Sequence, residues 1–131
     1  MQIEFPTDRE IFKGEIADYW LEDDGILVSV SKPPKRTVEN IKGNIELVKR
    51  ITNNKIPPLL IYLSPSPVPD KQTRKFVNEQ LPNLYKAMAM VSKPGLASVI
   101  MSFLFKFQSP PIPMMNFTDA GEARDWLRKF L

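Results

Sequence analysis

Strand-like and helix-like segments alternate along this sequence, and the alternation restricts the fold more than any single motif does. Two strand-like runs, Glu15–Leu21 and Ile26–Ser31, surround Asp24-Gly25, a dipeptide typical of hairpin turns. Beyond them, helical and strand patterns follow one another in turn. We therefore predict an α/β domain in the order β-β-α-β-α-β-α-β-α, with about five strands in a mixed, mostly parallel sheet.

Proline-rich stretches separate these segments, because proline cannot donate a backbone hydrogen bond and restricts the residue before it. Pro82, for example, is expected to end a helix. Residues 1–131 are predicted to form a single domain, with residues 1–14 as an N-terminal arm or edge strand. The predicted helices are Thr37–Asn53, Asp70–Leu81, Gly95–Gln108 and Asp119–Phe130, and the later strands are Ile56–Leu63, Tyr85–Ser92 and Pro113–Phe117.

Periodicity within two segments predicts which residues are buried. In Ile26–Ser31 apolar residues alternate with others, as in a sheet with one buried face. In the last helix, spacings of three and four residues define one apolar stripe. The stripe is Ala123, Trp126, Leu127 and Phe130, while Arg124, Asp125 and Arg128 are expected to face water.

Composition excludes several functional classes. The 131 residues include no histidine and no cysteine, so the commonest general base, the commonest metal ligand and thiolate chemistry are all absent. We expect no enzyme, no cofactor and no metal. The net charge of +3 is spread along the chain, which disfavours a nucleic-acid partner. No signal-peptide pattern is visible and the longest apolar run is too short to span a membrane, so a cytoplasmic protein is expected.

Four stretches resemble the SpoIIAA-like (STAS) proteins, in particular small stand-alone members common in Bacteroidetes-type bacteria. They are Trp20–Ile26, Lys86–Val91, Pro111–Pro113 and Phe117–Leu127. The resemblance implies a SpoIIAA-like fold and a non-catalytic bacterial regulatory or protein-interaction module. A distant relationship to CRAL-TRIO lipid-transfer domains, which enclose an apolar ligand, implies an alternative: a small carrier or sensor of a lipid or other apolar molecule.

The resemblance also points to one loop. In this family, anti-sigma-factor antagonists are switched by phosphorylation of a serine after the central strand. That loop is Ser64–Lys71 here, so Ser64 and Ser66 are the positional candidates, and Asp70 begins the next helix. The three residues form a possible phospho-switch or ligand loop. The Asp-Ser pair typical of the switch is replaced by Leu63-Ser64.

The predicted helix Gly95–Gln108 is apolar on all sides, so it must bury more than one face. One interpretation is contact with the core and with a second subunit, which makes a homodimer the expected assembly. The other is the wall of a pocket for an apolar small molecule, or a surface for an unknown protein partner. The candidate residues are Leu96, Val99, Ile100, Phe103, Leu104, Phe105 and Phe107.

Two charged clusters also have alternative interpretations. Glu22, Asp23 and Asp24 could bind a metal ion, but a calcium loop needs oxygen ligands at alternating positions over about 12 residues. A solvated hairpin turn is the preferred interpretation. The second cluster surrounds a diproline and could bind phosphate, but a solvated loop is preferred. It consists of Lys32, Lys35 and Arg36.

Overall fold

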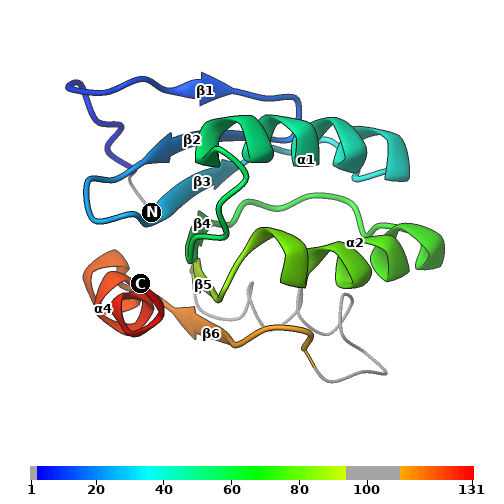
Figure 1. The fold of residues 1–131 in the computed structure, drawn as a ribbon. Coiled ribbons are helices and arrows are strands. Elements are labelled where there is room, and N and C mark those ends of the chain that lie inside the picture. Colours follow the sequence, from blue (N-terminus) through cyan, green and yellow to red (C-terminus); the bar gives the residue numbers. More distant parts are fainter. Residues whose placement is uncertain (1–2, 94–109) are drawn as a thin grey trace.

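The computed structural model describes residues 3–93 and 110–131, and within them one six-stranded sheet lies between helices (Figure 1). The strands are β1 Phe12–Lys13, β2 Ala17–Leu21, β3 Leu27–Ser31, β4 Leu59–Tyr62, β5 Met88–Val91 and β6 Met114–Phe117. The helices are α1 Val38–Thr52, α2 Lys71–Leu84 and α4 Ala120–Leu127, followed by the 3-10 turn η1 Arg128–Phe130.

The strands lie side by side in chain order, from β1 to β6. β2 is antiparallel to both β1 and β3, whereas β3, β4, β5 and β6 run parallel to one another. The predicted mixed, mostly parallel α/β sheet is therefore confirmed. The sheet has one strand more than expected, because Phe12 and Lys13 of the N-terminal arm pair with Tyr19 and Asp18.

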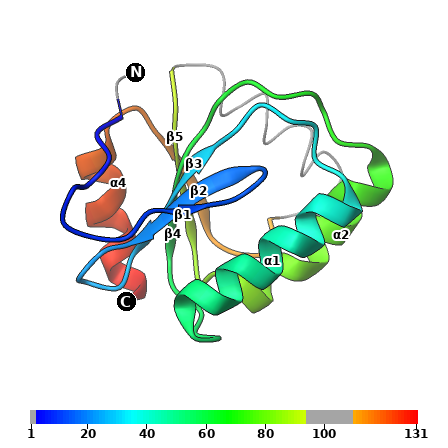
Figure 2. The same cartoon turned by 90° about the horizontal axis from the view of Figure 1, so that it is seen from above.

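The helices divide between the two faces of the sheet (Figure 2). The crossovers from β3 to β4 and from β4 to β5 advance in the same direction, and right-handed crossovers of that kind place both helices on one face. Val48 of α1 and Leu81 and Leu84 of α2 are buried there. On the other face α4 and the N-terminal arm pack, and Ala123 and Leu127 of α4 are buried.

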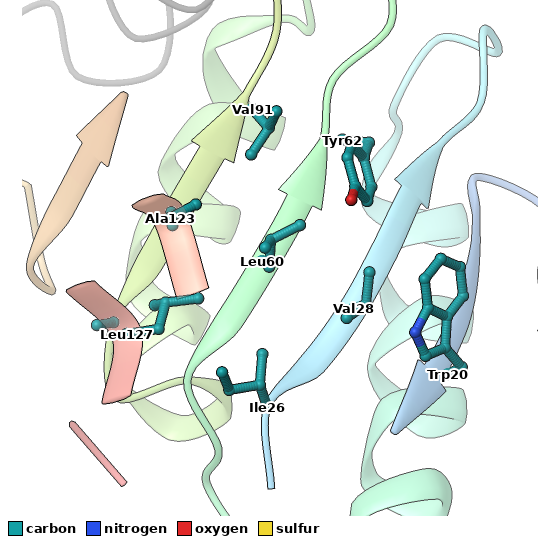
Figure 3. Close-up of a cluster of buried hydrophobic side chains, with 10 residues drawn as sticks. Trp20, Ile26, Val28, Leu60, Tyr62, Val91, Ala123 and Leu127 are labelled. Carbon is teal, nitrogen blue, oxygen red and sulfur yellow. The ribbon is translucent and has the colours of Figure 1, made fainter. Parts of the chain in front are cut away.

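Both faces of the central strands are closed, which corrects the expectation of one buried face for Ile26–Ser31. Leu27 and Val28 point to opposite faces and are 0% exposed, and Ser29 is only 1% exposed. The helices on both sides explain the difference, since a strand covered on both faces needs no polar side. Figure 3 shows the cluster on the α4 face, where Val28, Leu60 and Leu127 converge.

Local capping sets the ends of α1, which agree with the predicted bounds. The Thr37 hydroxyl accepts a hydrogen bond from the Asn40 N–H at 3.1 Å, and the Asn40 side chain accepts one from the Thr37 N–H at 2.8 Å. At the other end Asn53 adopts the left-handed conformation, with φ of 54°. The residues that fix both ends of the helix therefore lie within it or directly beside it in the sequence.

The end of α2 differs from the prediction, because the helix continues through Pro82 to Leu84. A proline removes its own N–H donor and crowds the carbonyl four residues earlier, but here the final turn still closes through the Tyr85 N–H, which donates to the Leu81 carbonyl at 3.0 Å. Leu81 and Leu84 are 5% and 6% exposed. Burial of these two leucines against the sheet therefore outweighs the local cost of the proline.

The predicted helix Gly95–Gln108 lies outside the described residues. Within the described ranges, no helix is long and apolar enough to cross a membrane.

Candidate functional site

The loop between β4 and α2 leaves the sheet at the carboxyl end of its parallel strands, the edge where α1 and α2 also begin (right side of Figure 1). Open α/β sheets commonly place ligands at this edge. The segment Ser64–Pro69 contains three prolines and forms no helix or strand. It is the predicted phospho-switch or ligand loop, and its serines differ in their surroundings.

Ser64 is half-buried and its hydroxyl is occupied. The Oγ atom donates a hydrogen bond to the Ser31 carbonyl at the end of β3, at 2.8 Å. Ser66 is exposed, as are Pro65, Pro67 and Val68 around it. Val68 has 41% of its surface exposed, which makes it one of the large apolar side chains that face solvent. The two serines are therefore not equivalent: one fastens the loop and the other is presented by it.

Asp70 is the cap of α2 and faces solvent. Its carboxylate accepts a hydrogen bond from the Thr73 N–H at 2.8 Å. That bond lowers the pKa of the Asp70 carboxyl below its ordinary value, and the positive charges of Lys35 and Arg74 lower it further. Arg74 also donates to the Pro69 carbonyl at 2.7 Å, which ties the loop end to the helix. The anionic cap opposes binding of an anion at this helix start.

Arg36 connects this edge to β3 and corrects the expectation of a solvated basic loop. Its guanidinium donates to the Ser31 hydroxyl at 2.8 Å, to the Ile16 carbonyl at 2.9 Å and to the Pro34 carbonyl at 2.7 Å. Burial lowers the pKa of Arg36. Arg36 bonds to the Ser31 hydroxyl and Ser64 bonds to the Ser31 carbonyl, so Ser31 links the arginine to the loop. The arginine thus joins the residue before β2 to the end of β3 and the loop that follows it.

The sequence reasoning missed Ser31 and Arg36 as parts of this edge. Both lie before α1, whereas Ser64 comes after β4, 33 residues beyond Ser31. The sequence contains only an indirect indication of this contact. The carboxyl ends of two neighbouring parallel strands must lie side by side, so the residues after β3 and β4 meet.

The hairpin turn between β2 and β3 is a second charged region, in which Glu22 is shielded in an ion pair whereas Asp23 and Asp24 are exposed, as expected of a solvated turn. Glu22 accepts two hydrogen bonds from Arg124 of α4, at 2.9 and 3.0 Å. Their side chains are only 21% and 23% exposed. Glu22 raises the pKa of Arg124, since its carboxylate stabilises the cation. The expectation that Arg124 faces water is therefore wrong.

The other two carboxylates of the turn also lie beside arginines. Asp23 is 3.3 Å from Arg9 of the N-terminal arm, and Asp24 is 3.6 Å from Arg128. No group of three or more acidic side chains suited to a metal ion occurs in residues 3–93 and 110–131. This turn joins the arm, the hairpin and the C-terminal helix, and its carboxylates serve the fold.

The predicted apolar ligand or interface residues lie outside the part of the chain that the structure describes. They are Leu96, Val99, Ile100, Phe103, Leu104, Phe105 and Phe107.

Comparison with known proteins gives a family and a fold. The family described as "Domain of unknown function (DUF7793)" matches residues 19–131. No curated protein matches the chain. Among solved structures, a crystal structure of an uncharacterized protein from the DUF3478 family, with a SpoIIAA-like fold, from Shewanella loihica PV-4, is similar. Identity is 19%, the alignment covers 91% of each chain and the TM-score is 0.53. The likeness confirms the SpoIIAA-like fold predicted from the sequence.

Proposed function

This chain belongs to the DUF7793 family and has a SpoIIAA-like fold, and on that basis we propose that it is a non-catalytic regulatory or protein-interaction module. The observation that carries the proposal is the exposed segment Pro65–Val68 at the carboxyl edge of the sheet. It presents an apolar side chain, Val68, on a backbone restricted by prolines.

The loop is suited to binding a protein because it has little conformational entropy to lose on association. Proline fixes one backbone dihedral, and a segment held in its bound conformation incurs less ordering entropy on association. Both ends are fastened: Ser64 to the Ser31 carbonyl at 2.8 Å, and Pro69 to Arg74 at 2.7 Å. A partner would therefore meet a preformed surface.

Regulation by phosphorylation is a finer part of the proposal, and Ser66 is the better substrate of the two serines. A kinase needs a free hydroxyl, and the Ser66 side chain is exposed whereas the Ser64 hydroxyl is bonded to β3. A phosphate on Ser66 would add about −1.5 to −2 charges at pH 7, four residues before the Asp70 carboxylate. Repulsion between them would push the loop away from the start of α2.

A photo-crosslinking amino acid at Val68 tests the docking role in the cell that naturally makes the protein. Ile56 is a matched control, because it is also a large apolar residue, 39% exposed against 41% for Val68, and it lies at the opposite end of β4. We expect a discrete adduct from position 68 and none from position 56. Equal labelling at both positions, or none at either, would contradict a docking loop.

Native mass spectrometry of the purified protein separates this function from the alternative and measures the proposed homodimer. A dimer without added mass agrees with an interaction module. A bound mass of a few hundred daltons, released on activation, would replace it with a carrier of an apolar small molecule, the occupant expected of a pocket of several hundred Å³.

A further inference from the structure

An open groove of about 510 Å³ lies between the first half of α1 and the backbone that leads from β1 into β2. The sequence patterns did not indicate it, because its two walls come from separate segments. This volume falls in the range of small-molecule sites. The lining residues are Gly14, Glu15, Ile16, Glu39, Asn40, Gly43, Asn44 and Leu47.

Gly43 leaves space in the groove that the rest of the described chain does not use. It sits within α1, where glycine is less favourable than alanine. A Cβ atom added at Gly43 would meet no atom within 4 Å. Packing therefore explains Gly14, whose added Cβ would lie 2.7 Å from the Ala17 carbonyl oxygen, but it does not explain Gly43. Close approach of a ligand to the helix backbone would explain a glycine at position 43.

A fixed carboxamide lies next to this space. The Asn44 side chain is hydrogen-bonded to the hydroxyl of buried Tyr19, with Oδ1 at 3.1 Å and Nδ2 at 2.7 Å. The tyrosine hydroxyl contacts both polar atoms of the amide, and an amide has more donor and acceptor capacity than one hydroxyl can fill. Asn44 can thus form further hydrogen bonds in the groove.

Negative charge is the only formal charge among the lining residues. Glu15 and Glu39 are both exposed, and neither forms an ion pair within the described ranges. Lys32 and Arg36 are bonded to the backbone of the groove wall, and neither is paired with Glu15 or Glu39. Lys32 lies 2.8 Å from Asp18 and donates to the Gly14 carbonyl, and Arg36 donates to the Ile16 carbonyl at 2.9 Å. Two carboxylates thus remain available to a bound cation.

We propose that this groove binds an ammonium or guanidinium group carried on a short alkyl chain. Glu15 and Glu39 would hold the cation, Asn44 would accept one of its N–H donors, and the alkyl chain would lie over Gly43 against Leu47. The site goes beyond the proposed docking function, since it lies beside β2 and α1, and the docking loop follows β4.

Titration of the full chain with agmatine, followed by NMR chemical shifts of the backbone amides, tests the site. We expect saturable shifts at Gly14, Gly43 and the Asn44 side chain. The decisive variant is Gly43→Leu, which fills the space and keeps both carboxylates. It should weaken binding at least tenfold while the protein stays folded. Glu15→Gln should weaken binding similarly, whereas Glu46→Gln, an exposed α1 carboxylate outside the groove, should not.

The two sources of such a cation are distinguished by a second probe. A short blocked peptide containing arginine should bind more tightly than agmatine if the cation belongs to a protein segment, and more weakly if the ligand is a free amine. A citrulline peptide of equal size controls for the charge. Shifts spread over many surface carboxylates, or unchanged affinity in Gly43→Leu, would overturn the proposal.

Discussion

Among single residues, the contact between Glu22 and Arg124 joins the hairpin to the C-terminal helix most directly. Both side chains are largely shielded from solvent, and the two hydrogen bonds are short. Arg124→Ala leaves the carboxylate without its partner, so we expect a loss of about 2 kcal/mol in the free energy of unfolding. Urea denaturation measures it. Arg128→Ala is the matched control, because Arg128 also pairs with the hairpin turn but is 51% exposed. This substitution should lower the free energy of unfolding by less than about 1 kcal/mol.

A double-mutant cycle with Glu22→Ala isolates the pair from the lost packing of the arginine stem. We expect a coupling energy of at least about 1 kcal/mol. Simple additivity of the two single changes would show that the contact contributes nothing specific.

The same pair shows why sequence periodicity cannot assign every charged side chain. The helical pattern places Arg124 away from the apolar stripe, and that placement is locally correct. Its partner lies 102 residues earlier, in a turn that the sheet brings beside α4. The capping residues Asp70 and Asp119 could be predicted, by contrast, because each bonds to a backbone N–H three residues further on.

Of the elements, α1 offers a test of its own, because two glycines meet at its groove for different reasons. Gly43→Ala adds a methyl group to open space and removes a flexible residue from a helix, so it should stabilise the protein by about 0.5–1 kcal/mol. Gly14→Ala forces a Cβ to within 2.9 Å of Leu47 Cδ2 and 2.7 Å of a carbonyl, and should destabilise it by about 1–3 kcal/mol.

Thermal unfolding of both variants decides the signs. Destabilisation by Gly43→Ala would mean that a neighbour occupies the space above α1, and the groove would then be smaller than described.

Helix and strand bounds can be predicted where the contacts that set them are local in sequence, and not where those contacts are tertiary. The bounds of α1 depend on Thr37, Asn40 and Asn53, which lie in or beside the helix. The end of α2 depends on the burial of Leu84, a tertiary effect that a proline rule cannot include. The edge strand β1 is two residues long, too short for any period, and exists because β2 offers it a partner.

At the scale of the whole molecule, the alternation of strand and helix patterns is sufficient to predict the parallel sheet. The candidate site can be predicted from the sequence only in part. The resemblance to SpoIIAA-like proteins points to the loop with Ser64 and Ser66, which follows a central strand. Which serine has an unbonded hydroxyl depends on the hydrogen bond from Ser64 to the Ser31 carbonyl, and this bond joins the segments that follow two different strands. The groove beside α1 depends on the same kind of information, since its walls are brought together only by the folded sheet.

Whole-molecule cooperativity can be measured through Tyr19 and Tyr85, which are buried between the sheet and the helices α1 and α2. Burial raises the pKa of Tyr85 well above 10.0, the neighbouring Tyr19 raises it further, and burial also raises the pKa of Tyr19. A raised folded-state pKa means that the folded protein holds the proton more tightly than the unfolded chain. The resulting stability is present below pH 10 and is lost as pH rises.

We therefore expect the Tyr85 phenolate to appear only as the protein unfolds. The difference in absorbance at 295 nm between the wild type and Tyr85→Phe should rise above pH 10, together with the loss of helical circular dichroism. In urea the same difference should titrate near 10, the ordinary value for tyrosine. If it titrates there in the folded protein, with the dichroism intact, then Tyr85 reaches solvent without global unfolding, and the layer under α1 and α2 opens on its own.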